Sequence, residues 1–397
     1  MKLVIITRGD LPVPATKGGA VETLTDLFIE KNNISKKIDL IIYSISDESM
    51  PKYDIHRPKT KYINIPHNNL QSKIKNAFLK IRTQISKRYQ GNYYILKVIE
   101  DLKKQSFDYI MIENAPLYAI CIKKYFPNAK IIQHLHNSYI TKDSLFLEDI
   151  LKSNDFIFGV SEFIKKEVIA ACIQQNQYRN NVYTWYNAIN EKTFKINSTN
   201  NNLKTELGFN TNDFIILFTG RIVEAKGIDK LLESMRYLVN TPNIKLLIVG
   251  GTSFANSKRT PFLTHILKLC NTHKEQIKFT GYINHDQIYN YYYLSDVCVF
   301  PSIWNEPFAL TALEAMTAGK PLIVTNSGGL PEVVDNKCAI ILEKNNNLAY
   351  NIAESIKKLY NNTQLRSTMG NYAQERAKQF SSKSFYNRFN ELLELIS

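Results

Sequence analysis

Short apolar runs alternate with segments of helical spacing along most of this 397-residue chain, and that alternation limits the fold more than any other feature. In the first half, we predict strands at Leu3–Thr7, Asp39–Ser44, Tyr109–Glu113, Lys130–Leu135 and Phe156–Val160, with helices at Ala20–Ile29, Tyr118–Lys124 and Glu162–Ile173. In the second half, we predict strands at Phe214–Thr219, Lys245–Val249, Lys278–Thr280, Val297–Phe300, Pro321–Thr325 and Ala339–Leu342. Such alternation is typical of mostly parallel, doubly wound sheets, so we predict an α/β fold.

The polar run Asn197–Asn202 separates the two series of strands and indicates a linker. We therefore predict two similar Rossmann-like domains, at 1–200 and 201–380. The last helical stretch, within 381–397, is expected to pack back on the first domain. Because ligands of such sheets bind beyond the carboxyl ends of the strands, two facing sheets would place a site in the cleft between the domains.

The composition restricts the class of protein. Hydrophobic residues make up 44% of the chain, which indicates a globular protein. The N-terminal run Lys2–Thr7 is too short for a signal peptide, no run reaches the roughly 18 apolar residues of a spanning helix, and the five cysteines are scattered, so we predict a cytoplasmic protein without disulfides or zinc. The net charge of +14 favours anionic partners, namely nucleic acid, an anionic membrane or phosphorylated substrates. A chain rich in Asn, Ile and Lys is also basic without any such function.

Two glutamates, Glu306 and Glu314, follow the predicted strand Val297–Phe300 and point to the chemistry of the second domain. Pro307 suits the first turn of a helix and Gly319 suits the position just past its end. The free amides and the dipole at the start of this helix would form an anion site. Eight residues of helix span roughly 12 Å, about the reach across a pyrophosphate, so the pair suits a nucleotide sugar. The plainer alternative is that both carboxylates are a helix cap and an exposed side chain.

A basic loop begins where the strand Phe214–Thr219 ends. Gly220 permits a tight turn, and Arg221 and Lys226 follow before a helix that begins near Ile228. A guanidinium and an ammonium at one loop suit a diphosphate, although basic loop residues are often only solvated.

Several segments with consistent spacing resemble one enzyme family. They are Gly220-Arg221, Lys226-Gly227, Gly281, Glu306, Glu314, Gly319-Lys320-Pro321 and Ser327-Gly328-Gly329. This set resembles the retaining glycosyltransferases of family 4, among the glycosyl transferases group 1, and the match is dense over 214–335. The resemblance implies the GT-B fold, in which two Rossmann-like doubly wound domains face each other across a cleft. It also implies a hexosyltransferase-type enzyme (EC 2.4) that acts on a nucleotide sugar with retention.

The resemblance implies roles for residues of the second domain. Arg221 and Lys226 would hold the donor pyrophosphate and neutralise the leaving group. Glu314 would accept hydrogen bonds from the ribose hydroxyls, and Glu306 would contact the donor sugar. Tyr282 lies where the family often contacts the base.

Backbone groups are also implicated by the resemblance. The amides of Phe308, Ala309 and Leu310 would face donor oxygens, although Ala309 stands where the family usually has glycine, which puts the sugar preference in doubt. In the first domain, Gly18 and Gly19 would let the backbone approach the phosphates or the acceptor.

A histidine of the first domain is expected to touch the donor sugar near the reacting carbon. We prefer His136 because it falls just past the end of the strand Lys130–Leu135, and we regard His134 as a core or rim histidine. With His136, the expected catalytic group contains Glu306, Lys226 and Arg221.

The chain has no Asp-x-Asp motif, so we expect no metal and no cofactor, with basic side chains and helix amides at the diphosphate instead. The donor is expected to be a UDP-sugar. The working mechanism is a same-face substitution in which the departing phosphate helps to deprotonate the acceptor hydroxyl.

The stretch Leu70–Tyr89 carries basic residues and no acidic residue. Its apolar members, at spacings of three and four, are Leu70, Ile74, Ala77, Phe78, Ile81 and Ile85. One interpretation is that residues 70–89 lie on an anionic membrane surface, which would make the protein peripheral on the inner face of the membrane and its acceptor a lipid-linked saccharide, as in cell-surface polysaccharide synthesis. The other is that the apolar stripe packs on the sheet and the lysines are solvated.

Other functions compete with sugar transfer. A phosphorylase is disfavoured by the short chain and the lack of a pyridoxal-lysine context. A non-catalytic nucleotide-sugar-binding protein remains open because of Ala309. A nucleic-acid-binding protein is suggested by the charge of +14 and the 23 tyrosines, but the basic residues follow no recognisable RNA-binding pattern.

Overall fold

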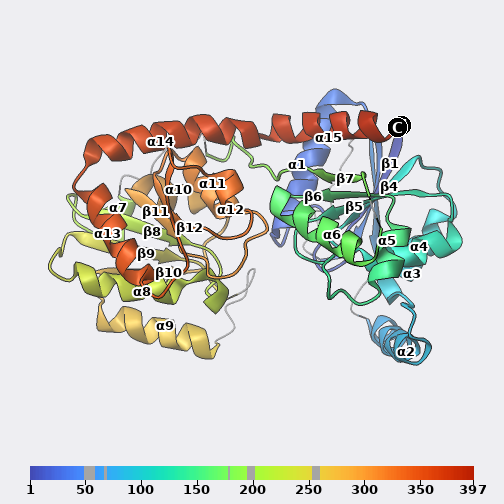
Figure 1. Cartoon of the computed structure of the whole chain (residues 1–397), viewed down its shortest axis with the longest axis horizontal. Helices are drawn as coiled ribbons and strands as arrows, with labels where there is room; N and C mark the ends of the chain where they lie inside the picture. Colours follow the sequence, from blue (N-terminus) through green and yellow to red (C-terminus); the bar gives the residue numbers. More distant parts are fainter. Residues whose placement is uncertain (49–58, 67–68, 178, 195–201, 253–259) are drawn as a thin grey trace. The chain divides into compact units, whose positions relative to one another are not determined.

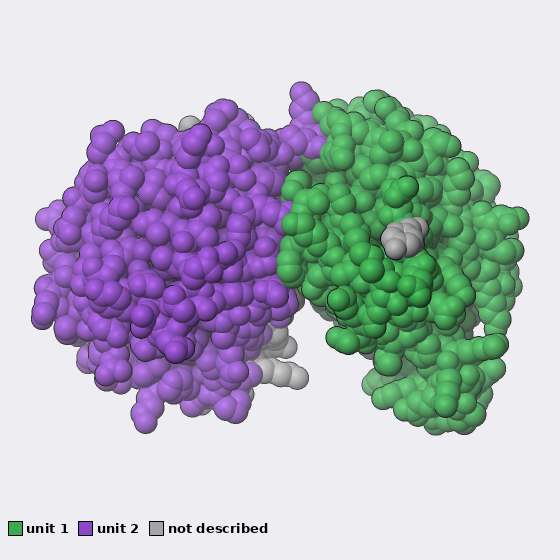
Figure 2. All heavy atoms as spheres, viewed as in Figure 1, with its two compact units in different colours: residues 1–186, 385–397 green, residues 187–384 purple. Residues whose placement is uncertain are grey.

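The computed structural model describes residues 1–48, 59–66, 69–177, 179–194, 202–252 and 260–397. The chain forms two compact units (Figure 2), one with Met1–Tyr186 and Phe385–Ser397 and the other with Asn187–Ser384. The change of unit therefore lies at 186/187 rather than at 200/201, and the predicted linker lies outside the described residues except for Asn202.

The position of this boundary has a structural cause in the second unit. The backbone N–H of Ile189 donates to Phe380, at 3.1 Å, and Ile189 forms a parallel bridge with Ser381. The Glu191 carboxylate accepts the hydroxyl of Ser382 at 2.9 Å. These contacts join residues about 190 positions apart in the sequence, so a local pattern such as the polar run could not predict them.

The first unit is built on a seven-stranded sheet of order β3-β2-β1-β4-β5-β6-β7, and every strand pair is parallel. Its strands are β1 (Lys2–Ile6), β2 (Asp39–Ile45), β3 (Thr60–Ile65), β4 (Tyr109–Glu113), β5 (Lys130–Leu135), β6 (Phe156–Gly159) and β7 (Val182–Thr184). Its helices are α1 (Ala20–Ser35), α2 (Leu70–Ser86), α3 (Tyr93–Leu102), α4 (Leu117–Tyr125), α5 (Leu147–Ser153) and α6 (Glu162–Gln174).

Both faces of the first sheet are covered. On one face, α3 and α4 bury apolar side chains against β1, β2 and β4. Near α1 lies a cluster of aromatic rings, in which the Trp185 ring stacks on Phe385 at 4.2 Å and Phe28 meets Phe389 edge-on at 4.8 Å. The Trp185 indole N–H donates to the Phe385 carbonyl at 2.9 Å. The chain from Phe385 onward, the later part of α15 (Ser382–Ile396), therefore completes the core of the first unit.

The second unit has a six-stranded parallel sheet of order β10-β9-β8-β11-β12-β13. Its strands are β8 (Phe214–Thr219), β9 (Ile244–Val249), β10 (Ile277–Gly281), β11 (Val297–Phe300), β12 (Leu322–Thr325) and β13 (Ala339–Leu342). Its α-helices are α7 (Leu203–Glu206), α8 (Ile228–Met235), α9 (Pro261–Thr272), α10 (Ile288–Leu294), α11 (Leu310–Thr317), α12 (Leu330–Val333), α13 (Leu348–Tyr360) and α14 (Thr363–Ala377), with 3-10 turns η1 (Glu224–Lys226), η2 (Arg236–Leu238) and η3 (Lys378–Phe380). Helices α8, α9 and α13 contribute to a core against one face of the sheet (Figure 1).

The strand orders confirm the predicted α/β architecture of two doubly wound sheets. In each sheet, the order reverses once, between β1 and β4 in the first unit and between β8 and β11 in the second. The loops that follow these strands diverge at such a point and leave a crevice where ligands bind. The fold therefore directs attention to the residues after β1, β4, β8 and β11.

Helix α11 begins later than predicted. Pro307 was expected in its first turn, but the helix starts at Leu310 and Ala309 is its N-cap residue, with φ −93°. The Phe308 side chain is buried and its ring packs edge-on against Phe380 at 5.8 Å, which holds this segment outside the helix. The predicted end is confirmed, since Gly319 follows the helix with φ 71°.

Helix α2 presents its apolar stripe to solvent. Side chains that share one face of the helix are 52% to 79% exposed, namely Leu70, Ile74, Phe78, Ile81 and Ile85. The opposite face makes the contacts with the rest of the unit, because Leu79 is buried and Asn76 accepts the backbone N–H of Tyr93 at 2.6 Å. The interpretation in which the stripe packs on the sheet is therefore wrong, and Figure 1 shows α2 projecting from its unit.

Candidate active site

The loops after β8 and β11 touch each other directly. Gly227 ends the loop after β8 with φ 66°, and a Cβ there would lie 2.0 Å from the Pro301 carbonyl oxygen. The Ile303 N–H donates to the Ala225 carbonyl at 3.0 Å. Glycine is required at this contact because the two backbones approach too closely for any side chain. The loops are thus joined at the point where the strand order reverses.

A lysine and a carboxylate meet where these loops join. Lys226 Nζ lies 2.5 Å from Glu306 Oε1, and the Ser302 hydroxyl donates to the same oxygen at 2.5 Å. The ammonium also lies 5.7 Å from the centre of the Trp304 ring. The Glu306 side chain is 6% exposed, whereas that of Lys226 is 22% exposed. A ligand can therefore reach the cation while the carboxylate fixes its position.

Arg221 supplies a second cation at the start of the same loop. It follows Gly220, whose φ is 143°, and its side chain is exposed. Its guanidinium makes no hydrogen bond or ion pair with any residue that the structure describes, and only its backbone carbonyl is engaged, by the N–H of Val223 at 3.1 Å. Arg221 is therefore available to an anionic ligand, as the sequence predicts for a diphosphate.

The loop after β12 holds the backbone of Glu306. The Gly329 N–H donates to the Glu306 carbonyl at 2.6 Å. Gly328 has φ 56°, and a Cβ there would lie 2.3 Å from the same oxygen and 2.7 Å from the Glu306 nitrogen. Gly328 and Gly329, which follow Glu306 in the sequence, thus hold its backbone in place by main-chain contact, whereas Lys226, which precedes it, contacts its carboxylate.

Glu314 lies within α11 and is 9% exposed. Its Oε2 accepts the hydroxyl of Tyr292, a fully buried side chain, at 2.7 Å, and its Oε1 lies 2.9 Å from His285 Nε2. The hydrogen bond with Glu314 and then the charge of Glu314 raise the pKa of His285 above its usual value. Sequence reasoning missed both partners. The only signal for His285 was its position four residues after Gly281.

The other predicted donor contacts occupy different environments. Tyr282 follows β10 and is 42% exposed. Phe308 and Ala309 are buried and precede α11, whereas Leu310 is its first residue. Among the three amides, only that of Leu310 therefore belongs to the first turn of the helix, where N–H groups lack intrahelical partners.

In the first unit, Gly18 and Gly19 lie in the loop between β1 and α1. Both have positive φ, at 72° and 103°. A Cβ on Gly18 would meet no described atom within 4 Å, whereas a Cβ on Gly19 would lie 2.2 Å from a carboxylate oxygen of Glu22. Glu22 was not identified from the sequence. The pKa of Glu22 is raised to about 7, mainly by burial. A hydrogen bond with its own backbone lowers the pKa, and the charges of Glu113 and Asp10 raise it further.

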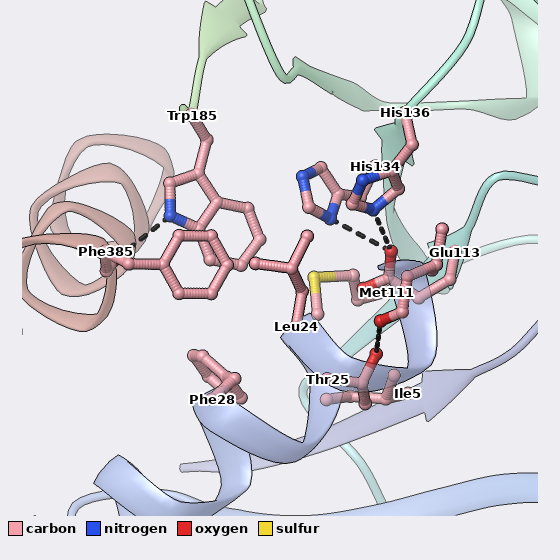
Figure 3. A pocket seen from close by; sticks show the side chains of 11 residues that line it. Ile5, Leu24, Thr25, Phe28, Met111, Glu113, His134, His136, Trp185 and Phe385 are labelled. Atoms are coloured by element: carbon pink, nitrogen blue, oxygen red, sulfur yellow. Dashed lines mark hydrogen bonds and ion pairs between the residues drawn. The ribbon is translucent and has the colours of Figure 1, made fainter. Parts of the chain in front are cut away.

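The two candidate histidines form one buried cluster with Glu113 (Figure 3). His134 Nδ1 and His136 Nε2 each lie 2.9 Å from Glu113 Oε2. The cluster borders a cavity of about 10 Å³, about the space for one water molecule, which is also lined by Leu24, Phe28 and other apolar side chains. The structure thus keeps both histidines together, and the preference for His136 stays a prediction.

Among the described residues, Glu113, His134 and His136 could also hold a metal ion, because one ligand atom of each lies within 4.8 Å of the other two. Both ring nitrogens lie at hydrogen-bond distance from a single carboxylate oxygen. That geometry is the one expected of two N–H donors on one acceptor. The expected lack of a metal requirement stays a prediction.

Comparisons with known proteins agree with this arrangement. The family model described as "Glycosyl transferases group 1" matches residues 199–376. The chain is 31% identical over 376 residues to "Putative glycosyltransferase YtcC" of Bacillus subtilis (strain 168), and the match covers 93% of this chain and 86% of that relative.

Solved structures of other proteins share the fold along the whole chain. A glycosyltransferase from Rickettsia africae ESF-5 aligns with a TM-score of 0.77 and 21% identity, covering 100% of this chain and 98% of that one. Anabaena Alr3699/HepE, solved in complex with UDP and glucose, aligns with a TM-score of 0.74 and 18% identity, covering 99% of each chain. These likenesses identify the fold as GT-B.

Proposed function

The chain belongs to the group 1 glycosyl transferases, and we propose that it transfers a hexosyl group from a UDP-sugar to a saccharide acceptor with retention of anomeric configuration. The observation that carries this proposal is the pair Lys226–Glu306, with Arg221 at the start of the same loop, where the strand order of the second sheet reverses. The UDP held by Anabaena Alr3699/HepE supports the choice of base.

Two cations would bind the diphosphate of the donor. Lys226 is held by a carboxylate that is itself buried, so its ammonium is positioned before the ligand arrives. Arg221 can present a planar fork to two phosphate oxygens. Both charges stabilise the negative charge that develops on the leaving diphosphate, and positions fixed in advance make that stabilisation effective.

Glu314 would bind the ribose of the donor. Its two oxygens already engage Tyr292 and His285. An ionised carboxylate has about four acceptor positions, so Glu314 can accept ribose hydroxyls while it keeps both protein partners. Its partners then fix the direction in which the remaining lone pairs point.

We place the reaction at one face of the sugar. The bond between the anomeric carbon and the diphosphate oxygen breaks, and the acceptor oxygen forms its bond on the same face. The acceptor proton passes to the departing diphosphate. This route needs no metal and no cofactor, in keeping with the expectation from the sequence.

A thermal-shift panel tests the donor site. UDP, GDP and dTDP and their glucose conjugates are added to the full chain at increasing concentration. At about 100 times its dissociation constant, a bound nucleotide stabilises the fold by roughly 2.7 kcal/mol. We expect UDP compounds to stabilise the wild type and Arg221→Ala to lose most of that effect. Lys230→Ala is the matched control, because Lys230 is an exposed basic residue of α8 that pairs with Glu233.

The panel can also reject the proposal. Stabilisation by none of these nucleotides, or equal stabilisation of the Arg221→Ala variant, contradicts a diphosphate site at this loop. Salt-sensitive retention of RNA without nucleotide-sugar turnover would favour the nucleic-acid-binding alternative instead.

We further propose that α2 attaches the protein to an anionic membrane surface and that the acceptor is a lipid-linked saccharide of cell-surface polysaccharide synthesis. The support is the exposed stripe with charge on both sides of it. At 100° per residue, Lys73 and Lys80 flank the stripe on one side, and Lys75 and Arg82 flank it on the other. No described helix is both long and apolar enough to cross a membrane.

The energies favour a lipid surface as the occupant of this face. Each basic residue near an anionic surface contributes about 1 kcal/mol. Removing the exposed part of Ile74, Phe78 or Ile81 from water contributes on the order of 1 kcal/mol each. The two terms act on the same face of α2, so together they favour a surface that is both anionic and apolar beneath its head groups.

Co-sedimentation of the full chain with lipid vesicles tests this surface. We expect binding to vesicles of equal parts phosphatidylglycerol and phosphatidylcholine, and little binding to phosphatidylcholine alone. The double variant Ile74→Ser with Phe78→Ser should bind at least about 10-fold less. Ile34→Ser is the matched control, because Ile34 is 71% exposed on α1. Equal binding to both vesicle types, or self-association that the double variant abolishes, contradicts the proposal.

A further inference from the structure

Glu113 holds the two histidines by the geometry of neighbouring strands. It is the last residue of β4, is 3% exposed, and stands opposite His134 in the parallel register of β4 and β5. Because side chains of a strand alternate between faces, His134 and His136 project to the same face. Both rings reach Glu113 Oε2 at 2.9 Å, His134 through Nδ1 and His136 through Nε2 (Figure 3).

We propose that Glu113 is a positioning residue that fixes His136 as its Nε2–H tautomer, so that His136 accepts, rather than donates, a hydrogen bond at Nδ1. The part of this inference that concerns a sugar rests on the proposed function. That part is the effect on sugar transfer, because the proposed function places His136 beside the donor sugar. Glu113 itself touches no substrate and acts through His136.

The tautomer follows from the hydrogen-bonding capacity of the groups. An ionised carboxylate offers acceptors only, so each nitrogen that faces it must carry a hydrogen. In neutral imidazole one nitrogen carries the hydrogen and the other carries the lone pair. When both rings are neutral, Nε2 of His136 is therefore the donor and Nδ1 the acceptor, whereas the assignment is reversed for His134.

The environment keeps Glu113 in the ionised form on which this depends. Burial raises the pKa of Glu113, but the interaction with His134 and the hydrogen bonds from both histidines outweigh it and lower the pKa to about 2. The carboxylate of Glu22 also interacts electrostatically with Glu113. With Glu113 ionised and Glu22 titrating near neutral pH, the cluster carries its fixed negative charge on Glu113.

His134 has a different role in the cluster. Its ring stacks on Trp185 at 4.3 Å and lies 4.1 Å from the His136 ring. His134 is 1% exposed, and its Nε2 has no hydrogen-bond partner among the described residues. Held between two rings, His134 supplies the second donor to Glu113 and a wall for His136. These contacts support His136, beyond the end of β5, as the functional histidine of the two.

Nitrogen NMR of the full chain with ¹⁵N-labelled histidine tests the tautomer directly. Two-bond proton–nitrogen correlations distinguish a protonated from an unprotonated ring nitrogen, and the variants His134→Gln and His136→Gln assign the signals. We expect a protonated Nε2 and an unprotonated Nδ1 for His136, and the reverse for His134. A protonated Nδ1 on His136, or a stoichiometric metal ion in the purified protein, overturns the inference.

Kinetics then test the positioning role. Glu113→Gln keeps the shape but removes the charge, and we expect kcat to fall about 10- to 100-fold with KM nearly unchanged, as for loss of a partner that orients a histidine. Glu113→Asp should recover part of the loss, because it restores the charge. Asp101→Asn is the control, a carboxylate in the same unit that accepts the Tyr43 hydroxyl at 2.9 Å. Equal effects of Glu113→Gln and Asp101→Asn contradict the inference.

The two readouts separate this inference from the proposed function. The NMR experiment measures the tautomer without any sugar, so it can confirm or contradict the tautomer even if no nucleotide binds in the thermal-shift panel. Transfer activity together with the wrong tautomer would remove only the role of Glu113.

Discussion

Gly328→Ala tests whether main-chain contact positions Glu306. The alanine Cβ would lie 2.3 Å from the Glu306 carbonyl oxygen, whereas ordinary contacts begin near 3.4 Å, so the Glu306 backbone must retreat by about 1 Å. The left-handed φ of 56° adds about 1–2 kcal/mol of strain, and overpacking adds about 1–3 kcal/mol. We therefore expect a loss of about 2–5 kcal/mol in the stability of the second unit.

The displacement also predicts a loss of function. Glu306 holds Lys226 at 2.5 Å, so the ammonium must move with the carboxylate. A misplacement of about 1 Å in a catalytic site costs about 100-fold in rate. We expect turnover of the donor to fall by about that factor and the Kd of the preferred nucleoside diphosphate to rise.

Gly208→Ala is the matched control for both measurements. Gly208 has φ 74°, but the nearest atom to a new Cβ is Lys278 Nζ at 3.5 Å, an ordinary contact. Only the backbone strain of about 1–2 kcal/mol is then expected, with normal affinity. Thermal unfolding followed by circular dichroism and titration calorimetry supply the two readouts. If Gly328→Ala matches Gly208→Ala in both, the argument from close approach is wrong.

Three further outcomes are expected. Lys226→Ala should reduce turnover by about 100-fold or more while Lys230→Ala leaves it unchanged, and near-normal transfer by the first variant would remove the phosphate role. Glu314 raises the pKa of His285 above the usual value of 6.5, so the pair stabilises the fold fully below pH 6.5 and loses this contribution as the pH rises through the raised pKa. The difference in Tm between wild type and His285→Gln should therefore shrink at alkaline pH. A difference in Tm that stays constant with pH contradicts the pairing. All five cysteines are free and buried, and burial raises the pKa of Cys298 to about 12, so native protein should not react with Ellman's reagent at pH 8, and rapid colour release before unfolding would contradict this packing.

The sequence predicts the central strands well because they carry continuous apolar runs. β5 and the edge strand β13 have the predicted bounds, as do the fully buried apolar strands β4, β8 and β11. Such runs are buried on both faces, so their limits coincide with the limits of the apolar segment. β3 was missed because it is a partly exposed edge strand of mixed polarity.

Contacts distant in sequence explain what could not be predicted. The start of α11 depends on Phe308 packing against Phe380, which local helix preferences cannot anticipate. The outward direction of the α2 stripe depends on Asn76, whose amide group meets the next helix. Both facts depend on tertiary structure.

Some residues of the candidate site had a weak signal that could have been used. Glu113 is an acidic residue at the end of a fully apolar strand, a position that needs a partner if it is buried. His134 lies where the next strand would pair with it. His285 and Tyr292 had no pattern of their own, since their only link to Glu314 is spatial.

The order of synthesis gives the divided first unit a particular history. Trp185 leaves the ribosome about 200 residues before Phe385 and Phe389, the rings against which it packs. At a synthesis rate of roughly 5–20 residues per second, about 10–40 s pass before the rings that cover Trp185 have been made. The continuous segment Asn187–Ser384 emerges during that interval, so its sheet can form while the earlier one is still open to chaperones.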